Sequence, residues 1–282
     1  MAFPKVEDLQ IDYTQNPFIR QSYIHYKGLD EKDKELINAY KAEMDASDWE
    51  DKPLDITYTV INWILYHKAI PMRNTPNLLK EHALTKEQFI KQIEYAHHLV
   101  DILSNFPRIE GRDNGITVFR GETPTLGEYI KSKKEEISIY SFLSTTVNLE
   151  VATTFNKGVL LVIHIPAGNP LPFISDHLSL NYRKGTTSSE SEVLLSPGST
   201  FFINGYIDNV EVLGKKCDVF YLTLLRLGPH DTRGLWNRYT KNTNKLYNEL
   251  KQNMNKMNVN RSRMRGQGHK KRNKTRKIKN KK

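Results

Sequence analysis

The sequence of 282 residues contains a single cysteine, Cys217. One thiol can form neither an internal disulfide nor a CxxC-type zinc site, so we expect no disulfide partner and no metal. The longest purely aliphatic run, residues 159–163, is far shorter than the roughly 20 residues that span a bilayer. The first residues show no basic stretch followed by an apolar one. We therefore expect neither a membrane segment nor a signal peptide.

Acidic residues are also lacking, but only at one end of the chain. Residues 231–282 contain 18 basic and two acidic side chains, a formal charge of +16, and residues 261–282 contain 12 basic side chains and no acidic one. Residues 1–230, with 24 basic and 30 acidic side chains, carry −6. A block of like charge with few apolar residues cannot form a core, so we predict a disordered tail over 229–282.

This basic tail has three interpretations. Residues 261–282 contain no aromatic residue that could stack on bases, so binding of nucleic acid there would be unspecific and driven by charge. A nuclear targeting signal and a solubilising extension are the alternatives.

Hydrophobic periodicity divides the rest of the chain. Apolar residues recur at helical spacing over residues 30–45, over 56–65 and from Thr85 to Leu103. After Pro107 the pattern predicts short strands at residues 116–120, 139–146, 158–165, 171–175, 190–195, 200–204, 207–213 and 219–227, with a short helix at 149–156. Helices followed by strands favour an α+β fold, and no GxGxxG motif points to a Rossmann fold.

Three short motifs carry candidate chemistry. Arg120 shares a strand face with Ile116 and Val118, so its guanidinium needs an anion, either a phosphate or a carboxylate of the chain. The second motif is the hydroxyl run Ser144-Thr145-Thr146. In the third, period two places Glu190 and Glu192 on one face, roughly 7 Å apart. Such a pair indicates an acid/base or cation-binding task, as in glycoside hydrolysis, or an exposed strand start.

Taken in this order, the motifs resemble the signature of the mono-ADP-ribosyltransferases of the Arg-Ser-Glu class, in the Glu-x-Glu, arginine-specific type. The likeness extends over roughly residues 29–227 and includes Tyr40 and Ile61-Asn62 in the N-terminal helices. It implies N-terminal helices followed by two packed, mainly antiparallel β-sheets, with NAD as co-substrate. The expected organisation is an N-terminal extension over 1–28, an ADP-ribosyltransferase domain over 29–228 and the tail over 229–282.

The resemblance also implies a role for each motif residue. Arg120, with Gly121, would bind the phosphates or ribose of NAD and hold the cleft together. Ser144 would orient Glu192, which would hold the 2′-hydroxyl of the nicotinamide ribose and stabilise the cationic ring as nicotinamide leaves. The cofactor-binding residues Thr145 and Thr146 would support strand geometry. Glu190 would attract and deprotonate an acceptor arginine.

The expected function is therefore transfer of ADP-ribose from NAD to an acceptor protein, on arginine, with release of nicotinamide. One alternative is an NAD glycohydrolase or a transferase for a non-protein acceptor. Another is a catalytically idle nucleic-acid-binding protein that acts through its basic tail. We expect an intracellular location, cytoplasmic or nuclear, or a virion or host cell if the chain is a virulence or viral factor.

Overall fold

The computed structural model describes residues 3–41, 61–62, 65, 86–111, 115–175, 177–178, 190–228 and 252. The basic tail over 229–282, apart from residue 252, and most of the helix expected at 56–65 lie outside these residues. The seven strands are β1 (Gly115–Glu122), β2 (Glu136–Ile139), β3 (Leu143–Thr146), β4 (Val159–Pro166), β5 (Glu192–Leu195), β6 (Ser199–Val212) and β7 (Lys215–Arg226). They form one sheet in the order β2-β6-β7-β4-β1-β3-β5, antiparallel except between β4 and β7. The predicted α+β class with mainly antiparallel strands is confirmed.

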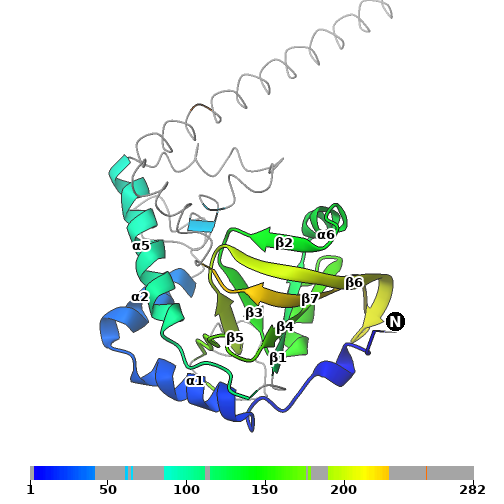
Figure 1. Cartoon of the computed structure of the whole chain (residues 1–282), viewed down its shortest axis with the longest axis horizontal. Helices are drawn as coiled ribbons and strands as arrows, with labels where there is room; N and C mark the ends of the chain where they lie inside the picture. Colours follow the sequence, from blue (N-terminus) through cyan, green and yellow to red (C-terminus); the bar gives the residue numbers. More distant parts are fainter. Residues whose placement is uncertain are drawn as a thin grey trace, which may run out of the picture.

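The two sheets expected from the resemblance are joined in this single sheet, which curves around a common core. β2 and β5 are its opposite edges, yet Ile137 of β2 and Leu195 of β5 lie in the same buried cluster as Phe201. The Ile139 carbonyl also accepts a hydrogen bond of 2.7 Å from the backbone N–H of Gly198, in the turn after β5. The two ends of the sheet therefore enclose one core, as the arrangement of the strands in Figure 1 indicates.

Three helices lie beside the β3–β5 end of the sheet: α1 (Pro17–Gly28), α2 (Glu31–Lys41) and α5 (Lys86–Ser104) (Figure 1). Most of their buried apolar side chains belong to a second cluster, which includes Phe142 and Leu194. Leu194 thus packs against the helices, whereas its neighbours Val193 and Leu195 pack into the first cluster. β5 is therefore buried on both faces, because successive side chains of a strand point to opposite sides of the sheet.

The first residues of the chain contribute directly to the core. Tyr13 and Ile19 are completely buried in the first cluster, and Tyr26 is 1% exposed in the second. The Asn16 side chain caps α1 by accepting hydrogen bonds from the backbone N–H groups of Phe18 and Ile19. The N-terminal extension expected over residues 1–28 therefore packs against the strands and helices that follow it.

Three shorter helices complete the described fold: the 3₁₀ helix η1 (Glu7–Leu9), α6 (Pro124–Lys131) and α7 (Leu149–Phe155). The helix predicted at 149–156 is confirmed as α7, whose first turn is capped by Asn148. α6 occupies a stretch to which the sequence analysis assigned no helix or strand. Its Pro124 lies at the first helical positions, where the missing N–H of proline costs no intrahelical hydrogen bond.

Three strand predictions are wrong in detail. Residues 139–146 belong to two strands, because β2 pairs with β6 whereas β3 pairs with β1 and β5. Residues 171–175 form no strand and make only an isolated bridge between Phe173 and Val193. The strands expected at 200–204 and 207–213 are one strand, β6, whose register shifts relative to β7 on either side of Gly205.

Candidate active site

A cavity of about 410 Å³ opens where β1, β3 and β5 meet α7 and the C-terminal end of α2. The sheet register explains why distant parts of the sequence meet here: Phe119 pairs with Thr146, which pairs with Glu192. The cavity wall includes all the predicted site residues, namely Arg120, Gly121, Ser144, Thr145, Thr146, Glu190 and Glu192. The three motifs are thus brought together in one site.

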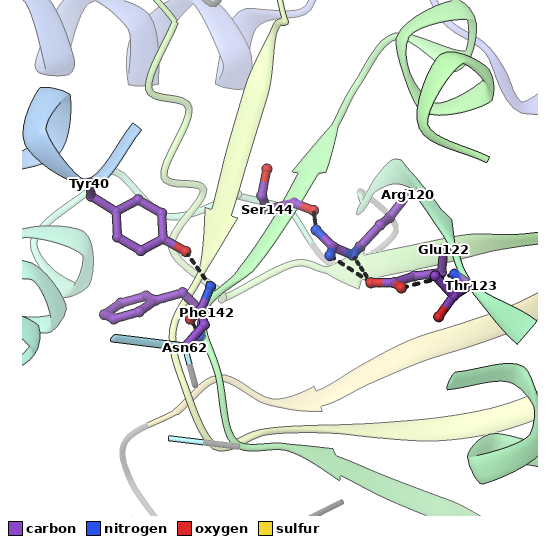
Figure 2. A network of polar contacts seen from close by, with 7 residues as sticks. All are labelled: Tyr40, Asn62, Arg120, Glu122, Thr123, Phe142 and Ser144. Carbon is purple, nitrogen blue, oxygen red and sulfur yellow. Dashed lines mark hydrogen bonds and ion pairs between the residues drawn. The ribbon is translucent and has the colours of Figure 1, made fainter. Parts of the chain in front are cut away.

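Arg120 links two strands of the cavity wall (Figure 2). Its Nη1 donates a hydrogen bond of 2.5 Å to the backbone carbonyl of Ser144, which ties β1 to β3. Its Nε donates to Glu122 Oε1 at 2.7 Å, and Nη2 forms an ion pair of 2.6 Å with the same oxygen. A carboxylate, one of the two kinds of anion that the sequence allowed, thus contacts Arg120, and it comes from the same strand.

Glu122 is a member of the site that the sequence analysis did not single out. Its side chain is 14% exposed, and Oε2 accepts a hydrogen bond of 3.1 Å from the backbone N–H of Thr123. The sequence could have indicated its contact with Arg120, because side chains two residues apart on a strand share one face and these two carry opposite charges. The carboxylate holds the guanidinium of Arg120 at the cavity wall.

Ser144 lies on the same sheet face as Glu192, in a diagonal position. It pairs with Leu194, and the next pair on that face of the ladder is Thr146 with Glu192. The Ser144 hydroxyl points away from Arg120 (Figure 2). No hydrogen bond joins this hydroxyl to Glu192 in the described part of the chain, so its orienting role stays a prediction.

The two threonines bind backbone atoms of the glutamate segment. Thr145 Oγ1 donates a hydrogen bond of 2.6 Å to the Val193 carbonyl, across the β3–β5 ladder. Thr146 Oγ1 donates at 2.6 Å to the Glu190 carbonyl and accepts from the backbone N–H of Asn148 at 3.0 Å. These contacts fit the predicted support of strand geometry, since both hydroxyls fix the segment that carries the two glutamates.

The glutamate segment departs from the predicted strand. β5 begins at Glu192, and Ser191 before it has a left-handed backbone with φ of 47°. The period-two argument therefore fails at Glu190, which lies before the strand and not in it. Both glutamates nevertheless line the cavity, Glu192 at 5% exposure. Within the described residues, the hydrogen bonds of Glu192 involve its backbone and not its carboxylate.

Gly121 permits a close approach between β1 and α7. A Cβ atom at this position would lie 2.3 Å from the Ala152 carbonyl oxygen and 2.4 Å from the Asn156 nitrogen. No side chain fits at such distances, because both contacting atoms belong to the backbone. The absence of a side chain at Gly121 thus allows α7 to pack directly against β1. α7 contributes Val151, Ala152 and Phe155 to the cavity wall.

A second group of polar contacts, at the cavity wall, joins the helices to the residue before β3 (Figure 2). Asn62 Nδ2 donates to the Tyr40 hydroxyl at 3.1 Å, and Asn62 Oδ1 accepts from the backbone N–H of Phe142 at 3.0 Å. The Tyr40 ring packs edge-on against the Phe142 ring, with centroids 5.1 Å apart. The sequence indicated Tyr40 and Asn62 only as parts of helices, because nothing local shows that they reach the strands.

The remaining cavity wall adds cations and an aromatic ring. Lys41 Nζ donates a hydrogen bond of 2.8 Å to the Ile174 carbonyl, and the exposed Lys157 follows α7 by two residues. Together with Arg120 and the carboxylates of Glu122, Glu190 and Glu192, they give the cavity wall charges of both signs. Phe155, which is 46% exposed, offers an unusually accessible ring at this wall.

The described residues include neither a candidate metal site nor a candidate membrane span. They contain no group of three or more histidine, cysteine, aspartate or glutamate side chains placed to hold a metal ion. Across the same part of the chain, none of the helices has the length and apolar character that crossing a membrane requires.

Comparison with known proteins finds likeness in structure alone. No protein-family model and no curated protein matches the sequence. The chain is similar to the C3larvin toxin of Paenibacillus larvae, an ADP-ribosyltransferase, at 15% identity and a TM-score of 0.46, over 73% of this chain and 94% of the toxin. It is also similar to an ADP-ribosyltransferase of Clostridium botulinum, at 17% identity and a TM-score of 0.45, over 79% of this chain and 98% of that enzyme.

A third similar structure is the ADP-ribosyltransferase Vis in complex with agmatine, at 17% identity and a TM-score of 0.43, over 80% of this chain and 88% of Vis. Because these identities and TM-scores are low, the case for a function comes from the cavity and its side chains. All three similar structures are named as ADP-ribosyltransferases, the class that the motifs of this chain resemble.

Proposed function

We propose that the chain transfers ADP-ribose from NAD to a guanidino group, that of arginine in an acceptor protein, and releases nicotinamide. The observation that carries the proposal is the position of Glu192, a residue only 5% exposed, at the wall of a cavity shared with Arg120, Ser144 and Glu190. A carboxylate fixed at a cavity wall can stabilise positive charge that develops on a ligand bound there. The volume of about 410 Å³ lies within the range of small-molecule sites.

In the proposed reaction, Glu192 stabilises the transition state in which the glycosidic bond breaks. As the glycosidic bond between C1′ of the ribose and the nicotinamide nitrogen breaks, its electron pair leaves with nicotinamide and the ribose becomes oxocarbenium-like. A carboxylate held against this ring stabilises the developing positive charge more than it stabilises the ground state. In this proposal Ser144, which shares a sheet face with Glu192, orients it or the ribose hydroxyls.

The cations and the aromatic ring of the wall suit the rest of NAD. Arg120, Lys41 and Lys157 supply positive charge for the diphosphate, with Arg120 offering the planar donor geometry that phosphate oxygens match. The accessible ring of Phe155 suits stacking on a planar heterocycle such as nicotinamide. Tyr40 and Asn62 brace Phe142 at the cavity wall.

In the proposed reaction, Glu190 selects the acceptor. A guanidinium has a pKa above about 12 and is a poor nucleophile while it is protonated. The Glu190 carboxylate attracts this cation and takes its proton as the guanidino nitrogen bonds to C1′. Its position before β5, outside the regular ladder, leaves it at the cavity wall beside Glu192. Where water takes the place of the acceptor, the same site hydrolyses NAD.

The basic tail and the domain limits remain proposals. We propose that residues 29–228 with the packed N-terminal segment hold the site, and that residues 229–282 serve to target or tether the protein. A tail of +16 over residues 231–282 raises local concentration at an anionic surface without taking part in chemistry.

The decisive experiment uses the purified full chain with labelled NAD, with agmatine or with a cell lysate as acceptor. Agmatine is a small guanidino compound that the structure of Vis contains. We expect nicotinamide release, label on agmatine and label on arginine residues mapped by mass spectrometry. Glu192→Ala should abolish both release and transfer. A wild-type chain that neither releases nicotinamide nor labels any acceptor would contradict the proposal.

A further inference from the structure

The turn between the two glutamates is held in an uncommon conformation. Ser191 has φ of 47° and is 1% exposed. Such a backbone is uncommon for a residue other than glycine and persists only where its surroundings fix it. This turn is what lets Glu190 lie before the strand and Glu192 begin it while both reach the cavity wall.

The partner of the Ser191 side chain comes from the first residues of the chain. Ser191 Oγ donates a hydrogen bond of 3.0 Å to the hydroxyl of Tyr13, whose side chain is completely buried. The backbone of the turn is fixed from the other side, because the Ser191 carbonyl accepts from Val147 N–H at 3.2 Å and the Glu190 carbonyl accepts from Thr146. Tyr13 does not line the cavity.

Gln10 makes a second connection from the same segment. Its Nε2 donates to the Val147 carbonyl at 3.0 Å, and its Oε1 accepts from the backbone N–H of Leu149 at 2.6 Å. The amide thus bridges the connection from β3 to α7, and Val147 in that connection bonds Ser191. Residues 10–13 therefore contact both backbone segments that place the glutamates.

We propose that Tyr13 is a positioning residue for the two glutamates, which acts through Ser191 on the backbone between them. The inference rests on the proposed function, since it concerns residues to which that function gives a catalytic role. The N-terminal segment then serves the reaction as well as the core: it sets the direction of Glu192 towards the ribose and of Glu190 towards the acceptor.

The test compares Tyr13→Phe and Ser191→Ala with the wild-type chain. Tyr13→Phe keeps the buried ring and removes only the hydroxyl. Each variant should lower kcat for nicotinamide release about fivefold, the size expected of one hydrogen bond, with little change in KM for NAD. The double variant should be no slower than either single one, because the two changes remove the same contact.

Tyr221→Phe is the matched control. The buried Tyr221 hydroxyl also bonds the N-terminal segment, donating to the Pro4 carbonyl at 2.8 Å, but Tyr221 does not line the cavity. This variant should keep the wild-type kcat. Amide hydrogen exchange gives a readout that needs no activity: residues 190–193 should exchange faster in Tyr13→Phe and unchanged in Tyr221→Phe.

The outcomes separate the two proposals. A wild-type chain without nicotinamide release contradicts the proposed function and leaves the exchange measurement to decide on positioning. Equal exchange of residues 190–193 in Tyr13→Phe and wild type overturns the inference. An active wild type with unchanged kcat in Tyr13→Phe, or a change in KM alone, overturns it as well.

Discussion

Arg120 and Glu122, two residues apart on β1, form an ion pair of 2.6 Å at the wall of the cavity. The alternation of a strand places both side chains on one face, so the pair forms without help from another element. The side chains are 26% and 14% exposed, and the guanidinium also bonds the Ser144 carbonyl. Glu122 therefore holds Arg120 in place and at the same time competes with an anionic ligand for its donors.

Glu122→Gln should strengthen NAD binding. The amide keeps the size and one acceptor oxygen of the carboxylate but removes a negative charge from the site of a diphosphate. We expect KM for NAD to fall about threefold, a change of less than about 1 kcal/mol, as suits a partly exposed ion pair. Steady-state nicotinamide release at varied NAD concentrations measures it.

Glu211→Gln is the control for that change of charge, because Glu211 is exposed on β6 and does not line the cavity. It should leave KM unchanged. A rise in KM in Glu122→Gln would mean that Glu122 mainly orients Arg120 for the ligand and does not compete with it.

Gly121→Ala should destabilise the fold. The added Cβ would lie 2.3 Å from the Ala152 carbonyl oxygen, so β1 and α7 must separate. Overpacking of this kind costs about 1–3 kcal/mol, and we expect a lower Tm in thermal unfolding followed by circular dichroism. Nicotinamide release should fall as well, because α7 forms part of the cavity wall.

Gly28→Ala is the matched control for Gly121→Ala. A Cβ atom on Gly28, at the end of α1, would have no atom within 4 Å. The Tm of Gly28→Ala should equal or slightly exceed that of the wild type, because alanine restricts the unfolded chain. Equal Tm values for the two variants would contradict the close approach at Gly121.

The sequence predicted which residues meet in the cavity better than it predicted the limits of the strands around them. Arg120, Ser144 and Glu192 each lie in short motifs whose chemistry is local, and the cavity contains all three. The limits of β6 were missed because local rules treat a glycine between two apolar runs, here Gly205, as the end of a strand. In the fold, hydrogen bonds to β7 continue on both sides of that glycine, and only long-range pairing reveals this.

Contacts between distant segments could not be predicted for the same reason. The pairing of Tyr13 with Ser191 joins residues 178 positions apart, and the bond of Asn62 to Phe142 joins residues 80 apart. No periodicity or propensity within a short window encodes such neighbours. Glu122 differs, since its partner lies two residues away and strand alternation alone would have indicated the pair.

His25 should make the fold less stable in mild acid. Burial lowers the pKa of its imidazole below the ordinary 6.5, and its ring packs against Phe106 with centroids 4.8 Å apart. The unfolded chain then binds a proton at a higher pH than the folded chain does, so the free energy of unfolding falls as pH drops below about 6.5. Urea unfolding at pH 7 and pH 5 measures the loss.

His25→Leu should reduce that loss, because leucine does not titrate. The variant retains part of the pH dependence, since burial also lowers the pKa of His97 and of His164. An identical loss of stability between pH 7 and pH 5 in the variant and the wild type would exclude His25 as a source.

Glu190→Gln should separate transfer from hydrolysis. Glutamine keeps the side-chain size but can neither attract a guanidinium by charge nor take its proton. Transfer to agmatine should therefore fall at least about 100-fold, the usual scale of general-base catalysis, while nicotinamide release into water stays within about threefold. Chromatography of nicotinamide and of ADP-ribosyl-agmatine measures both in one reaction. Glu192→Gln, two residues on, is the control and should lose both products, because it removes the charge beside the ribose. Retained transfer in Glu190→Gln would assign proton acceptance to another group of the cavity.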